Sequence, residues 1–96
     1  MLLKKKTRRM NLTDWVSLYN EEALLADGFE DAFLGMCEVF NRPPLATYDR
    51  DKCTEILIER DGMDYEDAVE FFEFNVAGSW VGENTPIYLT LRGEDE

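Results

Sequence analysis

The sequence predicts an α+β fold, in which a helical hairpin over about 50–60 and 65–77 packs on a small, mainly antiparallel sheet. The length of 96 residues fits one small domain and is enough to bury a core without a metal or disulfide. A hydrophobic share of 45% is ordinary for globular proteins. Apolar residues recur at spacings of three and four in the third quarter of the chain and alternate near its end. The first pattern predicts a helix, and the second predicts a strand.

Charge divides the chain into a basic start and an acidic body. Five of the ten basic side chains fall within the first nine residues: Lys4, Lys5, Lys6, Arg8 and Arg9. Residues 1–12 are therefore expected to form a flexible basic arm, 13–92 a single globular domain, and 93–96 a disordered acidic tail. At the start of the domain, Thr13 and Asp14 can cap a short helical turn. That turn would carry Trp15, Val16, Leu18 and Tyr19.

Helix and hairpin signals compete between residues 22 and 40. Residues 23–26 are good helix formers, but Asp27-Gly28 is a turn signal between two apolar runs. We expect a strand near 22–26, while 30–40 stays open between a buried strand and a helix that packs closely at Gly35. The prolines that end the run 41–44 predict a loop, because proline donates no backbone hydrogen bond and disfavours helix in the residue before it.

The second half of the chain has clearer boundaries. Residues 45–48 are a short strand candidate, and Asp49 is placed to cap a helix over about 50–60 that ends at Gly62. Its inner stripe is Cys53, Ile56 and Leu57.

Asp64 is placed to cap the second helix, over about 65–77, and Gly78 is placed to stop it. Its apolar face would consist of Tyr65, Ala68, Val69, Phe72 and Val76. A last strand is expected over 87–91, with Ile87, Leu89 and Leu91 on its inner side.

The body of the chain is strongly acidic. Residues 10–96 hold 21 carboxylates against five basic side chains, a net charge of −16. Such a body repels nucleic acid and anionic membranes and attracts cations or basic protein surfaces. No signal peptide or membrane-length apolar run is present, so we expect a cytoplasmic protein with no direct nucleic-acid or membrane partner. In a reducing compartment, Cys37 and Cys53 are expected to be small buried residues and not a disulfide.

The second predicted helix concentrates acidic side chains. It carries Glu66, Asp67, Glu70 and Glu73 without any lysine or arginine, which argues against DNA contact through it. From Asp64 to Glu73, five acids would give about one charge per 2.7 Å of helix, against about 1.7 Å in duplex DNA. This density is compatible with imitation of DNA, but the solvated face of an amphipathic helix is the favoured interpretation, because acidic helix faces are common.

Three residues that follow in the chain extend the candidate partner-binding set. Asn75 and Trp80 could mark a contact surface, or Asn75 could cap the helix and Trp80 could close the core. The predicted partner-binding set is Asp64, Glu66, Asp67, Glu70, Glu73, Asn75, Trp80 and Glu83.

Catalytic and metal motifs are weak. The chain has no histidine and no glycine-rich phosphate loop, so we expect a non-enzyme without cofactors. Asp49-x-Asp51 resembles the opening of a calcium loop, but Arg60 stands where its bidentate glutamate should be. Asp61, Asp64 and Glu66 could hold a divalent ion weakly. A carboxylate-lined cation or ligand site near Asp49, Asp61 and Asp64 therefore remains an alternative.

Several motifs resemble a family of short proteins found in tailed-phage genomes. They are Glu73-Phe74-Asn75-Val76, Trp80-Val81-Gly82-Glu83 and Thr85-Pro86, together with the run from Ala26 to Gly35. The resemblance implies a phage or prophage context, in which small acidic proteins often bind and inhibit host machinery. We therefore predict a non-enzymatic protein that occludes a basic, nucleic-acid-binding surface of a host or defence protein. The alternatives are the cation or ligand site above, and a small virion or assembly component that forms a homodimer or larger oligomer.

Overall fold

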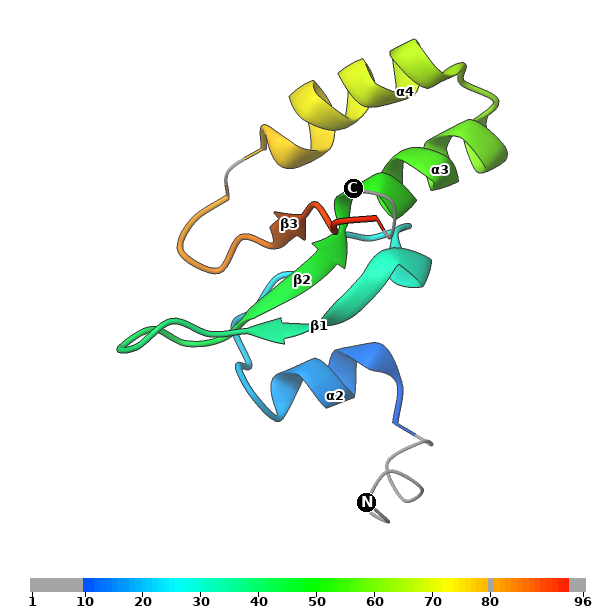
Figure 1. Ribbon diagram of the computed structural model, residues 1–96. Helices are drawn as coiled ribbons and strands as arrows, with labels where there is room; N and C mark the ends of the chain where they lie inside the picture. Colours follow the sequence, from blue (N-terminus) through cyan, green and yellow to red (C-terminus); the bar gives the residue numbers. More distant parts are fainter. Residues whose placement is uncertain (1–9, 80, 94–96) are drawn as a thin grey trace.

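The computed structural model describes residues 10–79 and 81–93, arranged around a three-stranded sheet in the order β1-β2-β3 (Figure 1). The strands are β1 (Phe33–Cys37), β2 (Leu45–Asp49) and β3 (Ile87–Leu89). The α+β prediction is confirmed, but the sheet is mixed and not mainly antiparallel. β1 pairs antiparallel with β2, whereas β3 pairs parallel with β2. The helices that connect β2 to β3 return the chain to the same end of the sheet, as parallel pairing requires.

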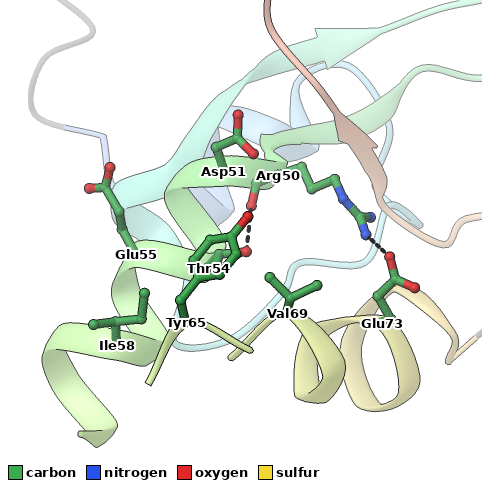
Figure 2. A pocket seen from close by; sticks show the side chains of 8 residues that line it. All are labelled: Arg50, Asp51, Thr54, Glu55, Ile58, Tyr65, Val69 and Glu73. Carbon is green, nitrogen blue, oxygen red and sulfur yellow. Dashed lines mark hydrogen bonds and ion pairs between the residues drawn. The ribbon is translucent and has the colours of Figure 1, made fainter. Parts of the chain in front are cut away.

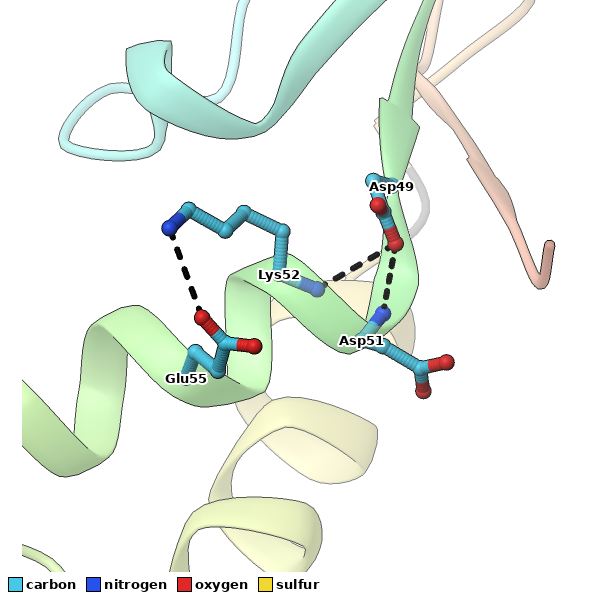
Figure 3. Close-up of polar contacts among 4 residues, drawn as sticks. All are labelled: Asp49, Asp51, Lys52 and Glu55. Atoms are coloured by element: carbon cyan, nitrogen blue, oxygen red, sulfur yellow. Dashed lines mark hydrogen bonds and ion pairs between the residues drawn. The ribbon is translucent and has the colours of Figure 1, made fainter. Parts of the chain in front are cut away.

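Two helices follow β2 directly. The first, α3 (Arg50–Asp61), begins at Asp49, whose carboxylate accepts hydrogen bonds from the N–H groups of Asp51 and Lys52 at 3.0 and 3.2 Å (Figure 3). It ends at Gly62, which has the left-handed φ of 72°. The second, α4 (Tyr65–Phe71), begins at Asp64, whose carboxylate accepts from the N–H of Asp67 at 2.9 Å. Both predicted N-caps are therefore present.

The second helix does not stay α-helical to its end. It continues as η2 (Phe72–Ala77), a π-helix, and Gly78 follows as its C-cap residue. A Cβ at Gly78 would lie only 2.6 Å from the carbonyl oxygen of Glu73. The wide π turn brings this carbonyl against the chain, so glycine is needed here for close approach and not for an unusual φ.

The N-terminal helix starts earlier than expected. It is α2 (Leu12–Ser17), and its cap is Asn11, whose Oδ1 accepts from the N–H of Asp14 at 2.8 Å. Thr13 and Asp14, the predicted caps, lie inside the helix, because Asn11 is the residue placed to meet the first free N–H groups. Residues 1–9 and 94–96, which include most of the predicted arm and tail, lie outside the described residues.

The expected strand near 22–26 is absent; residues 23–26 have no regular structure. Their backbone is held by single contacts instead of a strand ladder. The N–H of Leu24 donates to the carbonyl of Asn84 at 3.1 Å, and the N–H of Ala26 donates to Tyr48 Oη at 2.8 Å. The open segment 30–40 resolves into η1 (Glu30–Ala32), a 3-10 helix, followed by β1. The predicted loop over 41–44 is confirmed.

The core lies among the sheet, α3 and α4. Its buried residues are Phe29, Ala32, Ala46, Tyr48, Cys53, Leu57, Ala68 and Phe72. Cys53 is buried as expected, but Cys37 is exposed. Tyr65 is also exposed, because it lies in the first turn of α4, at the end of the helix pair that extends beyond the sheet (Figure 1).

The inner side of β3 also differs from the prediction. Tyr88, and not Ile87 and Leu89, packs on the core, with its ring centroid 5.0 Å from that of Phe72. Leu89 and Leu91 are exposed. The parallel register, which places Tyr88 opposite Tyr48, determines which side of this short strand faces inward.

Candidate functional site

The most prominent charged surface formed by the predicted partner-binding residues lies on α4. Glu66, Asp67 and Glu70 are all exposed. Across residues 10–79 and 81–93, no ion pair includes any of the three. We call these three carboxylates the acidic face of α4. Glu66 and Glu70 stand four residues apart, so they are neighbours on the helix surface.

Two other predicted acids have structural roles. Glu73 forms an ion pair with Arg50, at the start of α3 (Figure 2). The guanidinium of Arg50 also lies over the Phe72 ring, 4.8 Å from its centroid. Asp64 caps α4. Glu73 and Asp64 thus help to position the helix, and neither adds an unengaged charge to the acidic face.

A groove of about 550 Å³ lies between α3 and α4 (Figure 2). It is lined by Arg50, Asp51, Thr54, Glu55, Ile58, Tyr65, Val69 and Glu73. The groove therefore contains one guanidinium and three carboxylates, those of Asp51, Glu55 and Glu73. The guanidinium, that of Arg50, is already paired with Glu73. The exposed ring of Tyr65 adds an aromatic surface to this wall. Carboxylates beside an aromatic ring suit the cationic head of a lysine or arginine side chain.

Sequence reasoning missed the α3 side of this groove, although a signal was present. Asp51 and Glu55 are four residues apart and share one face of α3. Glu55 is also paired with Lys52, with 3.3 Å between Nζ and Oε1 (Figure 3). In the folded protein these carboxylates lie across the groove from Tyr65 and Glu73. The spacing of residues within either helix does not indicate this arrangement.

The remaining predicted residues do not join the acidic face. Asn75 is exposed in η2, and it does not cap the helix because Gly78 holds that position. Glu83 lies in the loop before β3, where it lines a hollow with Pro43. Trp80 lies outside the described residues.

The suggested cation site is not assembled. Asp49 and Asp64 cap different helices, while Asp61 binds the guanidinium of Arg60 at 2.9 and 3.0 Å. This pairing lowers the pKa of Asp61 and raises that of Arg60. Within the described ranges, no group of three histidine, cysteine, aspartate or glutamate side chains is placed to hold a metal ion.

Burial raises the pKa of three groups in or beside the core: Cys53, Tyr88 and Tyr48. It raises the pKa of Cys53 to about 11, an effect to which the Asp49 carboxylate adds. It raises the pKa of Tyr88 to about 12 and also raises that of Tyr48. These groups are neutral near pH 7 and serve packing.

The chain matches no family model, no curated protein and no solved structure. The resemblance to short phage proteins therefore stays a prediction. Among residues 10–79 and 81–93, no helix has both the length and the apolar character needed to cross a membrane.

Proposed function

We propose that this protein is a small non-enzymatic binding protein that covers a basic surface of another protein with the acidic face of α4 and the adjoining groove. The observation that carries this proposal is an excess of unpaired carboxylates. Residues 10–93 hold 18 carboxylates and five basic side chains, a net charge of −13. Three of those five, Arg50, Lys52 and Arg60, already form ion pairs with acids of this chain.

The acidic face has an electrostatic reason to bind cations. Glu66 and Glu70 repel one another across one helical turn, at a cost of about 0.2–0.5 kcal/mol for such a pair. A lysine or arginine placed between them removes that repulsion and adds attraction. The surrounding negative potential also steers a basic partner toward this side of the molecule.

The groove supplies shape next to the charge. A basic side chain from the partner that enters between α3 and α4 would meet Asp51 and Glu55 on one wall and the Tyr65 ring on the other. The paired Glu73 and Arg50 close the far end. We propose that the acidic face attracts the partner and that the groove fixes its register.

The identity of the partner as a host or defence protein rests on the phage resemblance. Imitation of DNA is a narrower form of the same proposal. It would depend on Asp64 to Glu70, because Arg50 neutralises Glu73. The DNA-like row of charges is thus shorter than the sequence predicted.

The test is capture of proteins from a nuclease-treated bacterial lysate on the immobilised full chain. Captured proteins should elute in salt steps between about 50 and about 500 mM, because exposed charges are screened over this range. The variant E66Q/D67N/E70Q should lose them. E21Q/E22Q/E38Q removes the same charge from exposed positions outside the acidic face and should retain them. Capture that is indifferent to salt and to the first variant would refute the proposal.

A further inference from the structure

We infer that an apolar surface beside η2 docks a short apolar segment of the partner that is flanked by lysine or arginine. This inference rests on the proposed function, because two residues of the acidic face form its rim. It concerns a surface different from the groove between α3 and α4, and it adds a hydrophobic anchor to a recognition that would otherwise be purely electrostatic.

The surface begins with a hollow of about 340 Å³ between the segment 24–29, η2 and β3. The large apolar side chains that line it are Leu24, Leu25, Phe29, Val76, Val81 and Tyr88. Leu24 and Val81 are exposed on its rim, whereas Phe29 and Val76 pack against the core. The hollow is thus open to solvent above a fixed apolar floor.

A second hollow continues the apolar surface along the outer side of the helix. Met63, Phe71 and Phe74 line it, and Asn75 lines both hollows. Phe74 is 74% exposed, although it lies in the middle of η2. Exposed aromatic residues around pockets are the usual anchors of protein–protein contacts. A π-helix is rare and is found frequently at functional sites, and here it forms the wall between the two hollows.

Charge selects the kind of partner. Asp27 lines the first hollow, and Asp67 and Glu70 line the second. Neither hollow has a lysine or arginine among its described lining residues. A segment with cationic flanks therefore places its charges opposite these three carboxylates when its apolar residues enter the hollows. A second copy of this chain is disfavoured, because it would bring the same carboxylates to the contact.

Asn75 lies where backbone recognition is possible. Its backbone carbonyl accepts a hydrogen bond from Ser79 Oγ at 3.3 Å, and within the described residues its side-chain amide forms no hydrogen bond. Its side-chain amide offers two donors and an acceptor at the junction of the hollows. An extended or helical segment that crosses this junction can use these groups without displacing an internal bond.

The experiment compares two labelled peptides of equal charge by fluorescence anisotropy. One is built of leucine and lysine, and in the other serine replaces every leucine. The full chain should bind the leucine peptide at least about tenfold more tightly, a difference of about 1.4 kcal/mol. Phe74→Ala should reduce this preference below about threefold, since truncation of a central aromatic anchor typically weakens binding by more than about fivefold. Phe40→Ala is the matched control: Phe40 is 89% exposed in the loop before β2 and lines neither hollow.

The possible outcomes separate this inference from the proposed function. Equal, salt-sensitive binding of both peptides would overturn the inference and leave the proposed function standing, while absence of binding by either would overturn both. An equal loss in Phe40→Ala and Phe74→Ala would also overturn the inference. Two further results would assign the surface to other occupants and so overturn it. The first is a dimer seen in sedimentation that Phe74→Ala dissociates, which would make a second copy of the chain the occupant. The second is tenfold tighter peptide binding after deletion of residues 2–9, which would make that segment of the chain the occupant.

Discussion

Replacement of Phe72 with alanine should destabilise the protein severely, whereas the same replacement at Phe74 should not. The two residues belong to the same π-helix and differ only in what surrounds them. Phe72 is fully buried, and its ring meets Tyr88 edge-on and lies under the guanidinium of Arg50 at 4.8 Å. Phe74 is exposed and lines only the outer hollow.

The expected magnitude follows from burial. Truncation of a buried phenylalanine to alanine costs about 3–5 kcal/mol, because it removes apolar contacts and leaves a cavity. Native domains of this length are stable by about 5–14 kcal/mol in total. Phe72→Ala should therefore remove a large part of the stability, and Phe74→Ala should change it by about 0.5 kcal/mol or less.

Urea unfolding followed by circular dichroism measures both variants. With a denaturant slope of about 1–3 kcal/mol per molar urea, the Phe72→Ala midpoint should fall by at least about 1 M. A loss below about 1 kcal/mol in Phe72→Ala, or an equal loss in the two variants, would refute the assignment of their environments. A folded Phe74→Ala protein also establishes that any loss of peptide binding in this variant is local.

Three further predictions concern the helix end, alkaline pH and the thiols. Gly78→Ala should lower the free energy of unfolding in urea by about 1–3 kcal/mol, because the added methyl group would lie 2.6 Å from the carbonyl oxygen of Glu73. An unchanged free energy of unfolding would contradict this contact. In the unfolded state Cys53 and Tyr88 have pKa values of 9.0 and 10.0, whereas in the folded state burial raises these pKa values to about 11 and about 12. The free energy of unfolding should therefore be at its full value below pH 9 and decline toward pH 12, because only the unfolded state gains the two charges in this range. Cys53 and Tyr88 each contribute at most about 2–3 kcal/mol to this decline. A free energy of unfolding that stays level from pH 9 to 11 would contradict the prediction. A chromogenic thiol reagent should modify the exposed Cys37 in the native protein and the buried Cys53 only after unfolding. Cys37→Ser should therefore remove the fast phase of the reaction. A fast phase that survives in this variant would show that Cys53 is accessible.

Local chemistry makes several features predictable from the sequence. Asp49 and Asp64 cap the two helices because each side chain needs only the N–H groups two or three residues ahead of it. Gly62 ends α3 for a similarly local reason, its left-handed φ. The excess of carboxylates over basic groups is a property of composition, so it follows from the residue counts alone.

The partly missed features depend on residues far apart in the chain. Glu73 looks like an unpaired charge in the sequence because its partner, Arg50, lies 23 positions away on another helix. The prediction for the inner side of β3 is wrong because a three-residue strand has too few positions for alternation to specify its face. The order of strand, two helices and strand could have indicated the parallel pairing, since helical crossovers join parallel strands.

The amino-acid sequence alone determined the α+β class, the starts of α3 and α4 and the acidic character of this protein, because capping, periodicity and charge act within a few residues or by simple summation. Tertiary structure decided which carboxylates stay unpaired, which aromatic residues are buried, and that the apolar surface beside η2 adjoins the acidic face. These properties arise from packing between distant segments: exposure and pairing belong to the space around a side chain, and only the folded chain defines that space.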